Sequence, residues 1–507
     1  MKDFRYMITG VVFAIVAVCM VTVLPARSEP VTDVSAYLKE EVITFSLSNG
    51  ISCLLLKREL APTLSLITSF RVGSADESYD TMGAAHLLEH MLFKGTDKIG
   101  TKNYAKEKKI LQKIEAVGET IDRLSLENPD NVMLPELKEQ LKQLQKQHKK
   151  YIVHSPYDSI YTRAGGVGFN ASTSRDKTTY YIELPSSKLE LWARLESERI
   201  RHPVLREFYL ERNTVYEERL MRYESSPVAR LFEDFTALSF LAHPYRHPII
   251  GWKSNIPYLS ISKIRKFYYD NYTPENMNIT IVGDMDVKET RKLLEKHFGS
   301  LPRGHSRQAI AIEESRQNLE RRFVLKDKAN PYLVIGWHKP TAPSKEDYVF
   351  DVVASLLSRG KSSRLYSSLV MDKQLASSVN AWNGYPGSRY DNLFVIAAAP
   401  VSSVEPGQLE KAIYDEIDRL LNECSDEDIQ RVINSTESSI VFDMDTNMGI
   451  ARTLNYYQTV FQDWRYFADY LEQVRSITCE DVKKVMKEYL VPGNRIVGIL
   501  ERPDSKK

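Results

Sequence analysis

One polar stretch interrupts this chain of 507 residues and divides it into two halves of similar make-up. It covers residues 301–321 and opens with Leu301-Pro302-Arg303-Gly304, which is typical of a linker between domains. On either side, residues 36–300 and 322–505 run from strand-like segments through helical segments and back to a strand. We therefore predict two related α+β domains, each a mostly antiparallel sheet with helices packed on it, although no sequence repeat is visible.

The composition is that of a folded protein and gives no sign of a charged partner. Hydrophobic residues make up 43% of the chain and charged residues 27%, which is enough for two sizeable cores. The 68 Lys and Arg residues balance the 67 Asp and Glu residues, for a formal net charge of +1. Because nucleic acids attract an excess of positive charge, this balance argues against a nucleic-acid partner.

The first residues have the composition of an export signal. Lys2 and Arg5 precede an apolar run over residues 8–24, and Pro25-Ala26-Arg27-Ser28 then supplies small residues for cleavage. This order is typical of a signal peptide over residues 1–28, so we expect export, with the periplasm as the destination. The apolar run is slightly long for a signal peptide, and an uncleaved anchor in the inner membrane stays open as the alternative.

Cleavage after Ser28 would leave three widely spaced cysteines, Cys53, Cys424 and Cys479. They include no Cys-x-x-Cys pair of the kind that binds metals or carries out redox chemistry. An oxidising compartment would permit a bridge between Cys424 and Cys479, but nothing in the sequence fixes that pairing.

Residues 104–151 differ from their surroundings and are rich in Lys, Glu, Gln and Leu. Apolar residues recur there at steps of three and four along two runs, which predicts two amphipathic helices. The break at Asn128-Pro129-Asp130-Asn131 separates the runs and predicts the tip of an antiparallel helical hairpin. We interpret this segment as an insertion that projects from the first domain, and its role stays open.

The strongest chemical signal is the motif His86-Leu87-Leu88-Glu89-His90, on a helix that we expect to begin near Gly83. Residues four apart share one face of a helix, so His86 and His90 can present two imidazoles to one ion. Zinc favours imidazole and carboxylate ligands, and a catalytic zinc site uses three protein ligands and one open position. We predict Glu89 as the general base that takes a proton from the zinc-activated water. Two unrelated helix histidines are the alternative.

Three segments together resemble one protein family. They are HLLEHMLFKGT at residues 86–96, GGVGFNASTSRDKTTYY at residues 165–181, and ERNTVYEERLMRYESSP at residues 211–227. In this order they are similar to the inverted zincins, the metallopeptidase family of pitrilysin, insulysin and mitochondrial processing peptidase. The resemblance covers nearly all of the chain after the export segment. It implies a two-domain, short-chain bacterial-type member that binds one Zn²⁺ per chain and forms half of a clam-like chamber.

The resemblance also implies the remaining residues of the metal site. In the family, the last zinc ligand follows an earlier functional glutamate by seven residues on one helix, and Glu211 and Glu218 have this spacing. Glu218 is the predicted ligand, with His86 and His90, and Glu211 is expected to support a ligating side chain. The neighbouring Glu217 lies about 100° round the helix from Glu218, so both cannot face the metal equally.

The strand around Asn170 and Ala171 resembles the edge strand on which the family binds extended substrates, main chain to main chain. We therefore expect Asn170 and Ala171 to bind a peptide or an unfolded protein segment. From the residues alone, the same stretch is a polar strand in which Asn170 could instead cap a turn.

The second half departs from the family at one point. Several members carry an arginine and a tyrosine that stabilise the oxyanion, and the matching positions here are Val370 and Ser377. The resemblance then implies a homo- or heterodimer in which a related chain supplies the Arg/Tyr pair. The function that we expect is a zinc-dependent endopeptidase. The alternative is a non-catalytic assembly subunit of the same fold.

Overall fold

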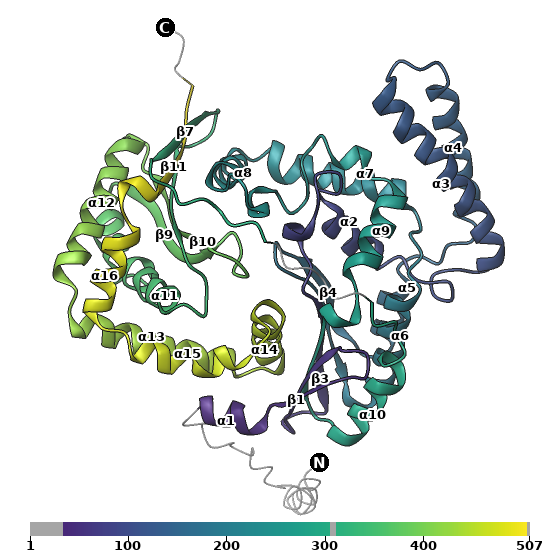
Figure 1. The fold of residues 1–507 in the computed structure, drawn as a ribbon, viewed down its shortest axis with the longest axis horizontal. Helices are drawn as coiled ribbons and strands as arrows, with labels where there is room; N and C mark the ends of the chain where they lie inside the picture. The colour runs from purple at the N-terminus through teal and green to yellow at the C-terminus, as the bar shows by residue number, and fades with distance from the viewer. Residues whose placement is uncertain (1–33, 305–310, 504–507) are drawn as a thin grey trace, which may run out of the picture.

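The computed structural model describes residues 34–304 and 311–503, and the predicted export segment lies outside them (Figure 1). Within these residues, no helix is both long enough and apolar enough to cross a membrane. The described chain forms two mixed sheets covered by helices.

The first sheet has the strand order β1-β2-β6-β3-β5-β4. Apart from the parallel pair β2 and β6, neighbouring strands are antiparallel. Strand β4 lies at one edge of the sheet, where its outer side is available to another strand. The strands are β1 (Ile43–Ser46), β2 (Ser52–Lys57), β3 (Thr63–Phe70), β4 (Val167–Thr173), β5 (Thr178–Pro185) and β6 (Met277–Gly283).

The second sheet has the order β7-β11-β8-β10-β9, and only β7 and β11 are parallel. In chain order, its five strands connect as β2 to β6 do in the first sheet, so the two sheets share one topology. This confirms the predicted pair of related α+β units, although no repeat is visible in the sequence. The strands are β7 (Arg321–Lys326), β8 (Tyr332–Lys339), β9 (Ala376–Tyr385), β10 (Asn392–Pro400) and β11 (Arg495–Glu501).

Helices of the first half cover one face of the first sheet and form the largest core cluster with it (Figure 1). They supply the apolar stripes that bury the strands' side chains. The helices described up to residue 300 are α1 (Val34–Glu41), α2 (Ala84–Met91), α3 (Tyr104–Glu127), α4 (Leu134–His148), α5 (Pro156–Arg163), α6 (Leu189–Arg201), α7 (Phe208–Arg219), α8 (Pro227–Ser239), α9 (Ile261–Asn271) and α10 (Val287–Phe298).

The second half has its own helical cover, which forms a separate core cluster with the second sheet. Its helices are α11 (Lys345–Ser358), α12 (Pro406–Glu423), α13 (Asp426–Asp443), α14 (Asn447–Phe461), α15 (Arg465–Arg475) and α16 (Cys479–Tyr489).

The two halves exchange one helix each. Helix α14 of the second half packs on strands β3 and β6 of the first sheet, and α8 of the first half packs on β11 of the second sheet. Buried polar contacts join α14 to the first sheet: Asn455 accepts a hydrogen bond from Ser69 at 2.6 Å and donates one to Thr280 at 3.2 Å. Each sheet is therefore completed by the other half, and the halves are not independent units.

The turn between β4 and β5 is held by contacts from both halves. The buried carboxylate of Asp176 accepts hydrogen bonds from the Tyr245 hydroxyl at 2.6 Å and from the backbone N–H of Ser388 at 2.7 Å. Beside it, Arg389 donates to the backbone carbonyl of Arg71 at 3.1 Å and forms an ion pair with Asp76. These contacts fix the position of the end of β4.

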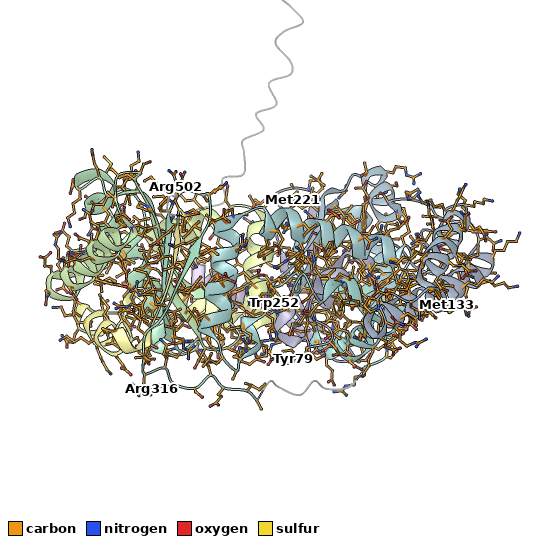
Figure 2. The ribbon with its side chains drawn as sticks, turned by 90° about the horizontal axis from the view of Figure 1, so that it is seen from above. Tyr79, Met133, Met221, Trp252, Arg316 and Arg502 are labelled. Atoms are coloured by element: carbon orange, nitrogen blue, oxygen red, sulfur yellow. A yellow bond between two sulfur atoms is a disulfide. The ribbon has the colours of Figure 1, made fainter. Side chains whose placement is uncertain are left out.

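Helices α3 and α4 form an antiparallel hairpin that projects from the first half, and Met133 lies at its far end (Figure 2). Its base is held by a buried polar cluster in which Glu107 contacts His148 at 2.8 Å and Arg206 at 2.7 Å. Along its length, Arg212 of α7 binds the carboxylate of Asp122 at 2.9 and 3.0 Å.

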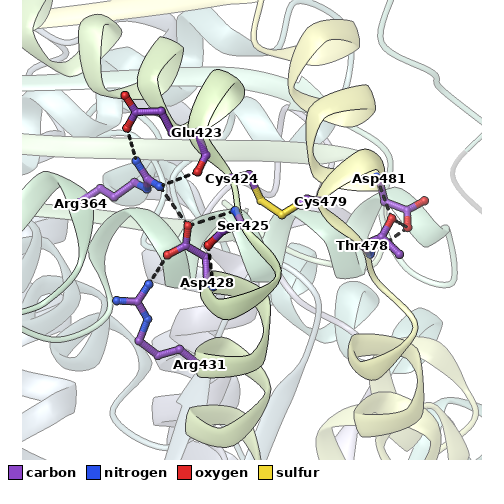
Figure 3. The surroundings of a disulfide bond; sticks show 9 residues. All are labelled: Arg364, Glu423, Cys424, Ser425, Asp428, Arg431, Thr478, Cys479 and Asp481. Carbon is purple, nitrogen blue, oxygen red and sulfur yellow. Dashed lines mark hydrogen bonds and ion pairs between the residues drawn. A yellow bond between two sulfur atoms is a disulfide. The ribbon is translucent and has the colours of Figure 1, made fainter.

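A disulfide bond joins Cys424, at the end of α12, to Cys479, at the start of α16 (Figure 3). This is the pairing that the sequence permits without fixing it. Next to the bridge, Asp428 receives hydrogen bonds from the side chains of Arg364 and Arg431. The third cysteine, Cys53, is buried and unbridged.

Candidate metal and catalytic site

The motif helix α2 begins at a glycine in a left-handed conformation. Gly83 has φ of 91°, and a Cβ there would meet the carbonyl oxygen of Ile250 at 2.7 Å, so a larger residue is excluded twice over. The buried carboxylate of Glu77 accepts the backbone N–H groups of Gly83 and Ala85, each at 2.8 Å. These contacts satisfy N–H groups at the start of the helix and fix its orientation.

Three side chains converge where α2 packs against α7. The Nε2 atom of His86 lies 3.8 Å from one carboxylate oxygen of Glu218, and the Nε2 atom of His90 lies 3.6 Å from the other. One ligand atom from each residue lies within 4.8 Å of the other two, which is the arrangement of a metal site. The three predicted ligands therefore come together, although they are distant in sequence.

The donor set has the chemistry of a zinc site. Zinc lies about 2.0–2.2 Å from nitrogen and oxygen ligands, so two ligands of a tetrahedral ion are about 3.4 Å apart, close to the separations here. Burial, followed by the positive charges of His90 and Arg222, lowers the pKa of His86 to about 3. His86 is therefore neutral at pH 7 and has a free lone pair for an ion. Its buried Nδ1 atom has no hydrogen-bond partner among the described residues.

Glu211 lies behind His90 and not in the ligand set. One of its carboxylate oxygens is 3.5 Å from Nδ1 of His90, while the other pairs with Lys94 at 2.5 Å. Burial lowers the pKa of His90, but the contacts with Glu211 and Glu218 outweigh it and leave that pKa raised. Glu211 thus turns His90 so that Nε2 faces the cluster. Glu217, in contrast, is exposed.

Glu89 lies next to the cluster and contacts the edge strand. Its carboxylate accepts a hydrogen bond from the hydroxyl of Thr173, the last residue of β4. Burial raises the pKa of Glu89, and the Thr173 hydrogen bond opposes this rise. A raised pKa makes this carboxylate a stronger base than an exposed glutamate, which favours its acceptance of a proton.

The predicted substrate-binding residues lie on β4, at the edge of the first sheet. Asn170 is exposed, and its side-chain oxygen accepts the backbone N–H of Ala171 at 2.8 Å. Ala171 is partly buried against the core of the first half. Both residues therefore lie on the strand whose last residue, Thr173, contacts Glu89. Their role in substrate binding stays a prediction.

Val370 and Ser377 lie in the second half, whereas the cluster of His86, His90 and Glu218, which we call the metal cluster, lies in the first half. Val370 packs against the core formed with the second sheet. Ser377, in β9, is exposed and donates a hydrogen bond to the carbonyl of Ala399 at 3.2 Å. Val370 has no polar side-chain atom and the Ser377 hydroxyl donates to Ala399, so neither residue supplies the guanidinium or the phenol hydroxyl of the Arg/Tyr pair.

Four further residues complete the site, and the sequence did not single them out: Glu77, Lys94, Thr173 and Arg222. Arg222 pairs with the predicted ligand Glu218 at 2.9 Å, from a position one helical turn later. Its spacing was a usable signal, since residues four apart on a helix interact. The contacts of Glu77, Lys94 and Thr173 cross between separate segments, which spacing does not reveal.

Two family models match the chain. The model described as Insulinase (Peptidase family M16) matches residues 54–133 and 159–252, and the model described as Peptidase M16 inactive domain matches residues 258–436. The first match includes α2 and α7, which carry the metal cluster. Helix α4 falls in the gap between its two parts, so this helix of the hairpin lies outside the family pattern.

Relatives and solved structures agree with these matches. The zinc protease PqqE of Helicobacter pylori is 26% identical over 460 residues, which are 89% of this chain and 90% of that protein. A crystal structure of a protease from Helicobacter pylori has a TM-score of 0.75 at 24% identity and covers 91% of this chain and 99% of its own. The periplasmic protease PqqL from Escherichia coli has a TM-score of 0.68 at 16% identity, covering 91% of this chain but only 48% of its own.

Proposed function

The chain belongs to the insulinase family of peptidases, family M16, and from this premise we propose that it is a zinc-dependent endopeptidase. Its substrates are peptides or unfolded protein segments that can lie extended against β4. The relatives named zinc proteases support this activity.

The observation that carries the proposal is the convergence of His86, His90 and Glu218 with Glu89 beside them. Two imidazoles and one carboxylate leave a fourth position open on a tetrahedral ion, as a catalytic zinc requires. A purely structural zinc site would be closed by a fourth protein ligand, and no further metal-ligating side chain joins the cluster in the described part of the chain.

Each residue of the site has a distinct part in the proposed reaction. Bound zinc would polarise the substrate carbonyl and lower the pKa of a water molecule towards neutrality. The carboxylate of Glu89 takes a proton from the attacking water and passes it to the amine that leaves when the peptide bond breaks. Thr173 holds that carboxylate at the end of the substrate strand, and Glu211 holds His90 in position.

Substrate binding by strand addition is supported by the position of β4. A peptide paired with the outer edge of β4 would lie with its main chain beside Glu89. In the free strand the Ala171 N–H donates to the side chain of Asn170, and in the proposed complex a substrate carbonyl would take the place of that side chain. Such binding selects an extended backbone before it selects a sequence.

A second chain is part of the proposal, because Val370 and Ser377 replace the Arg/Tyr pair. A related subunit, identical or different, would place that pair over the substrate carbonyl, and two such chains would close around a chamber. Support comes from PqqL, of which this chain matches about half, and from a separate structure of the first half of PqqL.

Export to the periplasm, with an anchor in the inner membrane as the alternative, is also a proposal. The disulfide between Cys424 and Cys479 supports it, because such bonds persist in oxidising compartments. Residues 1–28, which carry the export signal, lie outside the described residues.

A non-catalytic assembly subunit is the competing function, and the loss of the Arg/Tyr pair favours it. To separate the two, the native protein is isolated, any copurifying chain is identified, and peptide cleavage is assayed with and without that chain. Cleavage only with the partner supports a two-chain peptidase, and full activity of the pure chain refutes the partner. A zinc-loaded protein that cleaves nothing in either form supports the assembly subunit.

A further inference from the structure

A cavity of about 360 Å³ lies beside the metal cluster, between the two halves of the chain. Helix α8 and the turn after α7 form one side of it, and Tyr385 at the end of β9 forms the other. Aromatic rings of Tyr223, Phe232 and Tyr385 line the cavity together with three arginines, Arg175, Arg222 and Arg246. Its volume is that of a small-ligand or side-chain pocket.

The charges in this cavity are unbalanced. Its one acidic lining residue, Glu233, is held by the buried guanidinium of Arg219, which approaches it at 2.7 Å. Arg175 donates to the carbonyl of Tyr245 at 3.1 Å, and Arg246 donates to the carbonyl of Leu241 at 2.8 Å. Neither forms an ion pair with a carboxylate in the described part of the chain, so two positive charges are left for a ligand.

The cavity continues the path of a substrate along β4. Strand β4 ends at Thr173, which contacts Glu89, and Arg175 follows two residues later in the same chain segment. On the other side, Arg222 in the cavity wall pairs with Glu218 of the metal cluster at 2.9 Å. Since a strand rises about 3.3 Å per residue, a peptide that passes Glu89 along β4 reaches the cavity within a few residues.

We propose that this cavity is a substrate subsite that selects a carboxylate near the cleaved bond. Arginine guanidinium groups bind carboxylates in planar, charge-assisted pairs, and the surrounding rings limit the access of water that would weaken them. The carboxylate belongs either to an Asp or Glu side chain of the substrate or to its C-terminus. This inference rests on the proposed peptidase function and names the substrate class of the same site.

Binding to the inactive, zinc-loaded Glu89→Gln chain tests the subsite separately from catalysis. Three fluorescent peptides of one neutral sequence are compared by anisotropy: one with an internal Asp and an amidated end, one with a free C-terminus, and one with neither. The Asp is scanned through positions on both sides of the bond that the wild type cleaves. We expect at least one carboxylate peptide to bind about tenfold more tightly than the neutral peptide. The peptide that does so identifies the source of the carboxylate.

Replacing both Arg175 and Arg246 by Gln should reduce that preference to less than threefold, and Arg246→Gln alone should reduce it in part. Arg475→Gln, which removes an exposed arginine at the end of α15, is the matched control and should keep it. Zinc content and thermal unfolding show whether each variant is folded. If the double variant is not folded, the single variant Arg246→Gln provides the test. Equal binding of all peptides, or a preference that survives the substitutions, overturns the subsite and leaves the peptidase proposal untouched. A lack of cleavage by the wild type, assayed together with any chain that copurifies with it, overturns the peptidase proposal instead.

Discussion

The hydroxyl of Thr173 donates a hydrogen bond to the carboxylate of Glu89, and so joins the last residue of the edge strand to the motif helix. The position of the proposed base is therefore set by the strand on which we expect the substrate to bind. Movement of β4 would therefore disturb both the bound peptide and the carboxylate that takes the proton of the attacking water.

Replacement of Thr173 by Val should lower kcat/KM for a peptide about tenfold, because a hydrogen bond to a charged group contributes roughly 1.5 kcal/mol. Zinc content should not change, since Thr173 contacts no ligand in the described structure. Thr173→Ser keeps the hydroxyl and is the matched control. Equal activity of the Val and Ser variants would show that the contact is dispensable.

Replacement of Glu211 by Gln should weaken zinc binding by about 10- to 100-fold, because a neutral amide is a poorer partner for Nδ1 of His90. Competition with a chelator measures the zinc affinity. Glu217→Gln, on the exposed side of the same helix, changes charge equally and should leave the affinity unchanged. A loss in Glu217→Gln as large as that in Glu211→Gln would contradict the arrangement described here.

Local helix geometry predicts that His86 and His90, four residues apart on α2, can face one ion. The assignment of Glu211 and Glu218 rests instead on the family resemblance, in which the last ligand follows an earlier glutamate by seven residues. Helix geometry adds only that Glu217 and Glu218, both on α7, cannot face the metal equally. What the structure adds is the contact between the two helices, which places Glu218 against both imidazoles.

Contacts between distant segments could not be predicted in the same way. Nothing in the local pattern of α14 indicates that it covers the first sheet, since an amphipathic helix can bury its stripe against any apolar surface. The local pattern also does not show that α7 stops at Arg219 and that a wider π-helical turn follows to Glu224. Arg222 on that turn reaches Glu218 and the cavity.

Loss of the disulfide through Cys424→Ser with Cys479→Ser should lower the free energy of unfolding. The bridge closes a loop with a sequence separation of 55. Chain entropy alone gives about 4 kcal/mol for a loop of this size, and measured losses are typically about 2–4 kcal/mol. Urea unfolding with and without a reductant measures the effect. The reductant should destabilise the wild type and leave the double Ser variant unchanged, whereas equal effects on both would exclude the bridge.

Lys177 → Met should stabilise the protein at pH 7, by about 1–2 kcal/mol. Burial, followed by the charge of Arg452, lowers the pKa of Lys177 to about 8, so the folded state holds an unfavourable charge below that pH. Between about pH 8 and 10.5 the folded state releases this proton while the unfolded chain keeps it, so wild-type stability rises with pH. The advantage of Met, measured by urea unfolding at pH 7 and pH 10, should therefore shrink at the higher pH. An advantage that grows with pH would contradict the sign of the shift.

The most direct test of the zinc peptidase account is a paired measurement of zinc content and peptide cleavage in the wild type and in Glu89→Gln, each with its partner chain if one copurifies. The account predicts about one zinc ion per chain in both proteins, from His86, His90 and Glu218, and a loss of cleavage in Glu89→Gln of about 10²- to 10⁴-fold. A chain without zinc, or a Glu89→Gln variant that cleaves peptides as fast as the wild type, would contradict it.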